Sequence, residues 1–320
     1  MRWVRAAAVL LVAMGVSAGS TAFASGGGGL CSSNCVTTFV QRGAGRPFAI
    51  TQGPRHSEWF GQSRSIGRIG RSGKVFRYRV AGAQGTDISW ITVGPDKSIW
   101  FVERGTSGIG RMNKNGVVRQ YTIPDGANPQ GIAMGPNGDV YFTEGGISSI
   151  GRLNPRTGAV HSYLTPGGGF PLDLAFAPGG TSLWYTEEFD DRVGHMTLDG
   201  TFTEYDLPAG VSPLRIVAGP DGAMWFTELR GALVRVTQDG QMTTYQVGDF
   251  PIGITVGRDG MLYVALFAGS LVQVNLQGQV TGQWTLPGSA FQAGRGAGTD
   301  IWVTDYYGRH VYRVTPYAQG

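Results

Sequence analysis

The sequence predicts an all-β fold, a seven-bladed β-propeller with four antiparallel strands in each blade. The first observation is that an aromatic residue opens a short apolar strand seven times, with gaps of 41, 41, 43, 41, 38 and 39 residues. These residues are Trp59, Trp100, Tyr141, Trp184, Trp225, Tyr263 and Trp302. A period of about 40 residues is that of one four-stranded blade. The second observation is composition: 53 Gly and 16 Pro, with only 15% charged residues, favour many short strands joined by tight turns.

The third repeat shows the order of strands within one unit most clearly. Residues 128–134 form a short apolar run, and a Gly-Pro-Asn-Gly turn at 135–138 follows it. Residues 140–144 are aromatic and β-branched, which is typical of a second strand. Residues 149–153 and 159–164 are the third and fourth strands, separated by another turn. Four strands at this spacing predict an antiparallel meander.

The two ends of the repeat array complement each other. The last repeat has three strands and ends near residue 316, whereas the strand at 36–41 precedes the first repeat and resembles the fourth strands. We therefore expect the N-terminal strand to close the seventh blade, so that residues 36–320 form a single propeller domain.

The first 24 residues have the pattern of a signal peptide. Arg2 and Arg5 precede an apolar run at 6–16, and Ala22-Phe23-Ala24 is an A-x-A cleavage site. We expect cleavage after Ala24 and a secreted or extracytoplasmic protein, because no other apolar stretch reaches membrane length.

A Gly-rich tail is expected at 25–35, ahead of the propeller. Its two cysteines, Cys31 and Cys35, are expected to form a local disulfide in an exported protein. A lipid anchor on Cys31 is the weaker alternative, because no small residue precedes that cysteine.

The charge of the chain is nearly balanced. Without Arg2 and Arg5, 24 basic side chains face 22 acidic ones. This balance predicts no electrostatic footprint for nucleic acid or anionic lipid, and we expect a monomer without a membrane span.

Acidic residues recur three places after the repeated aromatics, where each second strand ends. In a meander this end lies at the same face of the disk as the start of strand one, so we expect the column to surround one mouth of the central channel. The column reads Gln62, Glu103, Glu144, Glu187, Glu228, Leu266 and Asp305. Neighbouring carboxylates repel each other, which favours a bound cation. We expect Mg²⁺ or Ca²⁺ at Glu144, Glu187 and Glu228; the alternative is that these residues are solvated copies of one ancestral glutamate.

The start of strand one supplies few catalytic side chains. Its column reads Phe48, Ser89, Gln130, Leu172, Leu214, Ile252 and Gln292, the last depending on the place of a one-residue gap. We expect Glu103, Gln130, Gln292 and Tyr306 to bind a ligand together with the carboxylates of the metal set. His310 starts a third strand beside the mouth, so Asp305 and His310 are the candidate catalytic pair.

The repeated motif resembles that of the virginiamycin B lyase family. The matching segments are Gly219-Pro220-Asp221-Gly222-Ala223-Met224-Trp225-Phe226-Thr227-Glu228, Ile66-Gly67-Arg68-Ile69 and Thr203-Glu204-Tyr205-Asp206-Leu207-Pro208. The resemblance covers residues 36–316 and implies a magnesium-dependent lyase that opens the ester of a cyclic streptogramin depsipeptide by elimination.

The resemblance also places functional residues, and this chain departs from them. The family has imidazoles at the starts of its last two blades, a Glu two residues before the second, and another Glu after the last second strand. The matching positions here are Ile252, Gln292, Ala290 and Tyr306, and Asp305 lies one residue before the last. We therefore expect a secreted propeller that binds a small molecule, glycan or peptide at its mouth without the family's lyase chemistry. The alternatives are a metal-dependent lyase using Asp305 and His310, and a propeller that serves protein interaction.

Overall fold

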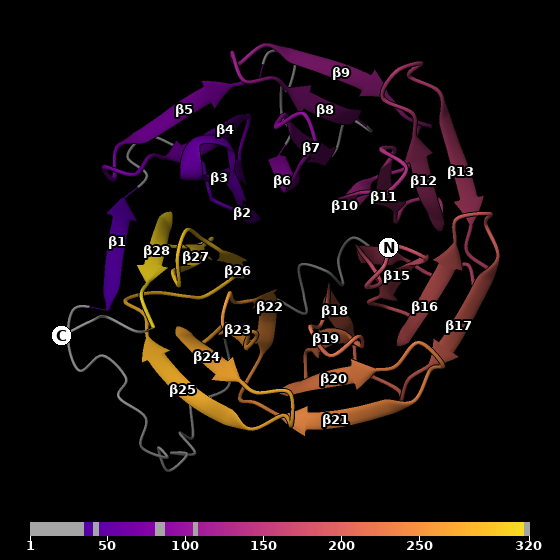
Figure 1. Ribbon diagram of the computed structural model, residues 1–320. Coiled ribbons are helices and arrows are strands. Elements are labelled where there is room, and N and C mark those ends of the chain that lie inside the picture. Colours follow the sequence, from indigo (N-terminus) through magenta and orange to yellow (C-terminus); the bar gives the residue numbers. More distant parts are fainter. Residues whose placement is uncertain (1–34, 41–44, 81–86, 105–107, 317–320) are drawn as a thin grey trace.

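Seven four-stranded antiparallel sheets form a ring around a central axis (Figure 1). The computed structural model describes residues 35–40, 45–80, 87–104 and 108–316. The predicted seven blades of four strands are confirmed. The expected signal peptide, the Gly-rich tail through residue 34 and Cys31 lie outside the described residues.

The blades follow one another in chain order. Blade 1 holds β2 (Ile50–Gly53), β3 (Ser57–Gln62), β4 (Ser65–Ile69) and β5 (Val75–Arg79), with a 3-10 turn, η2 (Pro54–His56), after β2. Blade 2 holds β6 (Asp87–Val93), β7 (Ile99–Arg104), β8 (Gly108–Met112) and β9 (Val118–Thr122). Blade 3 holds β10 (Pro129–Met134), β11 (Val140–Glu144), β12 (Ser149–Leu153) and β13 (Val160–Leu164).

The remaining blades repeat this order. Blade 4 holds β14 (Pro171–Phe176), β15 (Ser182–Glu187), β16 (Arg192–Thr197) and β17 (Phe202–Asp206). Blade 5 holds β18 (Pro213–Ala218), β19 (Met224–Glu228), β20 (Ala232–Val236) and β21 (Met242–Gln246). Blade 6 holds β22 (Pro251–Val256), β23 (Leu262–Leu266), β24 (Ser270–Val274) and β25 (Val280–Thr285). Blade 7 holds β26 (Gln292–Arg295), β27 (Ile301–Asp305) and β28 (His310–Val314).

The outer strand of blade 7 comes from the other end of the chain. β1 (Val36–Val40) pairs antiparallel with β28, and Val36 lies opposite Val314. The two ends of the propeller therefore meet in one sheet, as Figure 1 shows at β1 and β28.

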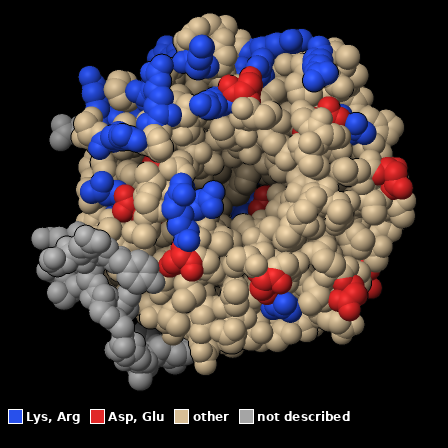
Figure 2. Space-filling model, in the orientation of Figure 1, with Lys and Arg blue, Asp and Glu red and all other residues tan. Residues whose placement is uncertain are grey.

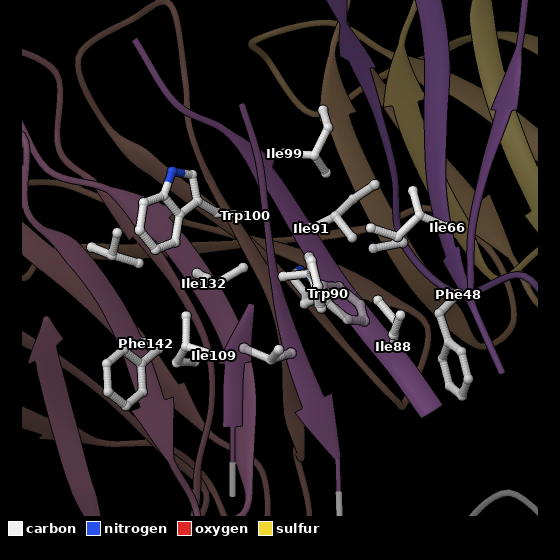
Figure 3. Close-up of a cluster of buried hydrophobic side chains, with 14 of the residues drawn as sticks. Phe48, Ile66, Ile88, Trp90, Ile91, Ile99, Trp100, Ile109, Ile132 and Phe142 are labelled. Carbon is white, nitrogen blue, oxygen red and sulfur yellow. The ribbon is translucent and has the colours of Figure 1, made fainter. Parts of the chain in front are cut away.

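The core lies between neighbouring blades, where the second strands pack. Trp100 and Phe142 are fully buried or nearly so, and Figure 3 shows them with side chains of blades 1 to 3 in one apolar cluster. The ring of the residue that follows the repeated aromatic packs on strand three, and this contact explains the glycine of the Ile-Gly-Arg motif. A Cβ on Gly151 would collide with the ring of Phe142, so only glycine lets that ring lie flat on β12.

The threonine of the Trp-Phe-Thr-Glu motif joins blades. Thr186 Oγ1 accepts the backbone N–H of Asp173 in its own blade and donates to the carbonyl of Leu214 in the next, at 3.3 and 2.8 Å. The first of these contacts lies at a register shift in β14, where two residues oppose one on β15. Thr143 and Thr227 make the same pair of bonds, so one threonine links two inner strands in three successive blades.

Among the described residues, no helix is long and apolar enough to cross a bilayer.

Candidate functional site

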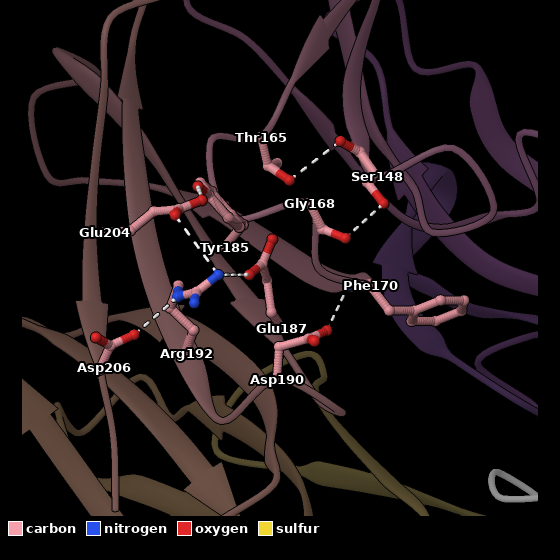
Figure 4. A network of polar contacts seen from close by, with 10 residues as sticks. All are labelled: Ser148, Thr165, Gly168, Phe170, Tyr185, Glu187, Asp190, Arg192, Glu204 and Asp206. Carbon is pink, nitrogen blue, oxygen red and sulfur yellow. Dashed lines mark hydrogen bonds and ion pairs between the residues drawn. The ribbon is translucent and has the colours of Figure 1, made fainter. Parts of the chain in front are cut away.

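The carboxylate of Glu187 faces Arg192, a residue of its own blade (Figure 4). Its Oε2 lies 3.3 Å from Nη1 of Arg192, which also lies 3.7 Å from Glu204 on the outer strand β17. Glu204 in turn accepts a 2.8 Å hydrogen bond from Tyr185. Burial and the charge of Glu204 raise the pKa of Glu187 to about 7, against the opposing charge of Arg192. Glu187 therefore belongs to a buried network that holds the outer strand.

Asp305 has an equivalent position in blade 7 and is held still more tightly. Its carboxylate accepts hydrogen bonds from the Ser289 hydroxyl at 2.6 Å, the Gly308 N–H at 2.8 Å and the Tyr312 hydroxyl at 2.8 Å. His310 Nδ1 lies 3.3 Å from Oδ2, so the structure brings the candidate catalytic pair together. Asp305 is 1% exposed, and its contacts connect the loop before β26 to strand β28.

The expected ring of carboxylates around the channel is not what the structure shows. Glu103 accepts hydrogen bonds from Gln120 on the outer strand β9, at 2.9 and 3.2 Å. Glu144 is fully buried, and burial raises its pKa against the opposing Ser162 hydroxyl of β13. Burial likewise raises the pKa of Glu228, with Arg230 opposing. Glu103 and Glu144 are thus directed toward the outer strands of their own blades, because alternate residues of a strand lie on opposite faces.

The expected cation set does not fit either. No group of three His, Cys, Asp or Glu side chains within the described ranges is arranged to hold a metal ion, and this includes Glu144, Glu187 and Glu228. Each of the three lies in a different blade with contacts of its own. We therefore derive no chemistry through a metal at this position.

The mouth is lined by apolar side chains from the starts of the inner strands. Phe48, Leu172, Leu214, Ile252 and Phe291 belong to one buried cluster, against which Leu229, Phe267 and Tyr306 pack. The register of blade 7 corrects the alignment of its first strand. Ala293 lies opposite Val303, as Ile132 lies opposite Phe142, so Phe291 and not Gln292 occupies the column of Leu172.

The two glutamines expected to bind a ligand have different surroundings. Gln130 is 4% exposed, and its Nε2 donates to the carbonyl of Asn128 at 3.3 Å. Gln292 is half-buried and lines a cavity on the axis, and its Oε1 has no hydrogen bond within the described part of the chain.

Aromatic rings gather at the mouth where blades 6, 7 and 1 meet. We call Phe48, Phe267, Phe291, Tyr306 and Tyr307 the aromatic cluster. The ring centroid of Tyr306 lies 4.7 Å from Phe48, 5.4 Å from Phe291 and 5.0 Å from Tyr307. Phe267 lies 5.8 Å from Tyr307.

A guanidinium group covers one side of this cluster. The Arg46 carbon Cζ lies 4.9 Å from the Tyr306 ring centroid, and its Nη1 donates to the Tyr306 hydroxyl at 3.3 Å. A cation over an aromatic ring is a favourable arrangement. The guanidinium covers only part of the two tyrosines, since Tyr306 is half-buried and Tyr307 is 36% exposed.

Four charged side chains lie deeper, around the axis, and we call them the axial charged group: Arg104, Asp173, Glu188 and Arg215. Arg215 is 8% exposed, and its guanidinium stacks 3.6 Å from the ring of Trp90. Its Nε and Nη1 have no hydrogen bond within the described residues. Burial lowers the pKa of Arg215 to about 10, with Asp173 and then Glu188 opposing. Burial raises the pKa of Glu188 to about 7, with Arg215 and Arg104 opposing.

Inner strands of six blades line a cavity of about 190 Å³ on the axis, and Trp90, Asp173 and Gln292 are among its residues. Figure 2 shows the hollow at the centre of the ring, with basic and acidic atoms inside it. Drug-sized ligands fill pockets of about 300 Å³ or more, so this cavity holds a side group or several waters and not a whole ligand of that size.

Other residues at the mouth were, with one exception, not predicted from the sequence. Each of them follows directly after a member of the column that runs from Gln62 to Asp305. They are Ser63, Arg104, Gly145, Glu188, Leu229, Phe267 and Tyr306. Of these residues, only Tyr306 was predicted from the sequence to bind a ligand. The sequence did contain a signal for them. Successive residues of a strand lie on opposite faces, so if the acids are directed away from the mouth, the next residue is directed toward it.

Sequence and structure comparisons agree on one family. A model of the virginiamycin B lyase family matches residues 34–181 and 177–319. No curated protein matches the chain. A solved streptogramin B lyase has 25% identity and a TM-score of 0.81 over 87% of this chain and 96% of its own. A catalytically inactive variant of virginiamycin B lyase from Staphylococcus aureus, solved with quinupristin, has 26% identity and a TM-score of 0.81 over 88% and 98%.

More distant structures share the fold alone. The hydrazine synthase of Kuenenia stuttgartiensis has 13% identity and a TM-score of 0.73 over 86% of this chain and 97% of its own. The family model covers nearly the whole propeller, and this chain therefore belongs to the virginiamycin B lyase family.

Proposed function

We propose that this protein binds an apolar, ring-bearing small molecule at the mouth of its axial channel and does not open it. The aromatic cluster is the observation that carries the proposal. Its five rings come from three blades and lie at the face where ligands of propellers usually bind, and three of them, Phe267, Tyr306 and Tyr307, remain partly exposed. The proposal replaces the carboxylate-rich mouth expected from the sequence by an aromatic one.

The axial charged group would give such a ligand its polar contacts. Arg215 has two buried nitrogens without a hydrogen bond in the described chain, and an unpaired buried donor costs about 1–3 kcal/mol. A carbonyl or carboxylate group that reached Arg215 would recover that cost. A ligand with an apolar body and one such acceptor fits this arrangement best.

The family's elimination chemistry is not supported by the residues at the starts of the last two blades. The resemblance places an imidazole at each of these positions, and this chain has Ile252 and Phe291 there. The solved inactive relative owes its description to the replacement of a single histidine by alanine. A chain that has apolar residues at both positions is therefore proposed to bind without turnover.

The test uses quinupristin, the compound in the solved inactive relative, as the probe. Titration calorimetry should detect binding to the wild type, and Phe291→Ala combined with Tyr306→Ala should weaken it about tenfold or more, since each large ring contributes roughly 1–3 kcal/mol of buried apolar contact. Phe76→Ala, a half-buried ring on the outer strand β5, is the matched control. Chromatography should find the cyclic compound unopened. Absence of binding, or equal weakening by the control, would contradict the proposal.

A second candidate rests on the Asp305–His310 contact of 3.3 Å. A carboxylate that orients an imidazole is a common arrangement for general base catalysis, so a lyase acting through His310 is the alternative. It predicts that quinupristin is opened by the wild type and that turnover is lost in both Asp305→Asn and His310→Ala. Turnover that persists in either variant would reject it.

We also propose that the protein is exported, on the strength of Arg2, Arg5 and the Ala22-Phe23-Ala24 site. N-terminal sequencing of the protein from culture medium should begin at Ser25. Retention of the first 24 residues would contradict export by this route.

A further inference from the structure

Charge is divided unevenly between two parts of the ring. Residues 36–122, which hold β1 and blades 1 and 2, contain 14 Lys or Arg and 4 Asp or Glu. Residues 123–320 contain 10 and 18. The formal charges of the two parts are therefore +10 and −8. The balanced total, from which the sequence predicted no electrostatic footprint, hides a strongly dipolar protein.

Most of the basic side chains of the first part are exposed, ten of the fourteen. We call its ten exposed cations the basic sector: Arg46, Arg55, Arg64, Arg71, Lys74, Arg77, Arg79, Lys97, Lys114 and Arg119. Of the four acids, Glu58 and Glu103 are buried, Asp87 is half-buried, and Asp96 forms an ion pair with Arg111. Figure 2 shows the basic atoms gathered over the side of the ring that carries β4, β5, β8 and β9.

The basic sector is continuous across the boundary between the two blades. β5 alternates exposed and half-buried residues, so Arg77 and Arg79 project from the same face. The turn at 113–116 of blade 2 reaches this strand, because a Cβ on Gly116 would lie 3.3 Å from the Tyr78 ring. Lys114, on that turn, therefore continues the row of cations.

This concentration of charge is little compensated within the protein. Arg77 donates to the Ser65 hydroxyl at 2.9 Å, and none of the other nine members of the basic sector takes part in an ion pair within the described residues. At physiological ionic strength charges interact over roughly 8 Å, so neighbouring cations on one strand repel each other. A polyanion that binds here relieves that repulsion and releases its own counterions.

We propose that the basic sector binds a linear anionic polysaccharide that carries sulfate or phosphate groups. Seven of the ten cations are Arg, whose planar fork matches the oxygens of these groups. Within the described residues, the surface lacks the exposed rings on which the bases of single-stranded nucleic acids stack. Its aromatic rings are buried or half-buried, as where Tyr78 stacks on Trp59 at 5.4 Å, so no exposed ring in the described part of the sector can stack on a nucleobase.

A membrane fits the sector less well than a flexible polymer does. Among the described residues 36–122 no aromatic anchor is exposed, although the exposed ring of Tyr307 lies beside Arg46 at one end of the sector. The exposed large apolar residues of this part are Val40, Val75 and Val117, which are scattered singly. The outer strands β5 and β9 form part of the convex edge of the ring (Figure 1), and six of the ten cations are on these strands or on the turns before them: Arg71, Lys74, Arg77, Arg79, Lys114 and Arg119. A chain molecule can follow this curve. These observations favour a polysaccharide over a lipid surface.

Heparin, a linear sulfated polysaccharide, is the probe. We expect the wild type to bind it with an affinity that falls as salt is added. Lys74→Glu, Arg79→Glu and Arg119→Glu combined should weaken binding about tenfold or more and reduce the dependence on salt. The matched control is Arg230→Glu, Arg258→Glu and Arg295→Glu combined, which makes the same change of charge at exposed positions in blades 5, 6 and 7. It should bind nearly as the wild type does.

Two further measurements separate the polysaccharide from other polyanions. Duplex DNA and phosphatidylglycerol vesicles are titrated under the same conditions, and melting curves of both triple variants exclude unfolding as the cause. Equal weakening by the two triple variants, or no weakening by the first, overturns the proposal. So does tighter binding of DNA or vesicles than of heparin, if that binding is lost in the first variant.

Discussion

The hydroxyl of Thr186 donates a 2.8 Å hydrogen bond to the carbonyl of Leu214 in the next blade. Thr186 is fully buried, and its oxygen also accepts the N–H of Asp173 in its own blade. One side chain therefore satisfies two backbone groups at the irregular start of two inner strands. Thr143 and Thr227 make the same contacts. The threonine of the Trp-Phe-Thr-Glu motif therefore hydrogen-bonds each of these blades to the next.

Thr186→Val should lower the free energy of unfolding by about 1–3 kcal/mol, because it leaves a buried N–H and a buried carbonyl unpaired in a side chain of nearly the same volume. Urea denaturation measures this loss. Thr186→Ser retains the hydroxyl and should lose less. If the two variants were equally destabilised, packing and not hydrogen bonding would explain the threonine.

Gly151→Ala should destabilise the propeller by about 1–3 kcal/mol, because the added methyl group collides with the buried ring of Phe142. Gly70→Ala is the control, since the nearest atom to its Cβ would lie 3.5 Å away, at ordinary contact distance. Thermal melting of the two variants compares them directly. A Gly151→Ala protein as stable as Gly70→Ala would show that the ring of Phe142 can move aside.

Glu187→Gln should stabilise the protein at alkaline pH and not at acid pH. The folded-state pKa of Glu187 is raised to about 7 from an ordinary value of 4.5, so the folded state holds the proton more tightly than the unfolded state does. Stability therefore falls as the pH rises from about 4.5 to about 7, by at most roughly 3 kcal/mol. Glutamine removes this loss. Denaturation of both proteins at about pH 4 and pH 8 tests it, and a difference independent of pH would contradict the assignment.

Asp305→Asn should lower stability by about 2 kcal/mol or more, since it weakens hydrogen bonds from Ser289, Gly308 and Tyr312 to a charged acceptor. Although burial opposes them, these bonds lower the pKa of Asp305. Their contribution is present above an ordinary pKa of 3.8 and is lost as the pH falls through the lowered value. Asp249→Asn, at an exposed position, is the control for unfolding experiments at neutral pH. Equal stability of the two variants would contradict the role given to Asp305.

The architecture could be predicted because the repeat is visible in the residues that build it. The repeated aromatic, the glycine of strand three and the turn glycines each have one structural task per blade, and so they recur at one spacing. The candidate site could be predicted only in part, since its residues differ from blade to blade. Tyr306 and Gln292 were found at or near the mouth, whereas Phe48 and Phe291 were not assigned to a ligand because apolar residues carry no chemical signature.

Two errors have simple physical causes. Glu103 and Glu187 recur in the sequence because they hold outer strands, and the side chain that faces the mouth is the next one, Arg104 or Glu188. Equivalent residues of successive blades lie on a circle around the axis, but their spacing in the sequence does not show whether their side chains are directed toward the channel or toward the outer strands. The net charge of the whole chain did not reveal the basic sector, because a sum over all residues does not show where the charges lie.

The pairing of β1 with β28 has a consequence for how the molecule is made. Val36 is among the first propeller residues to be synthesised and Val314 among the last, so the seventh sheet can be completed only after all seven blades have been synthesised. Until then β28 is a strand edge without its neighbour, at which another copy of the chain could pair. Closure of the ring is thus a late step of folding, and its contacts have nearly the largest sequence separation within the propeller.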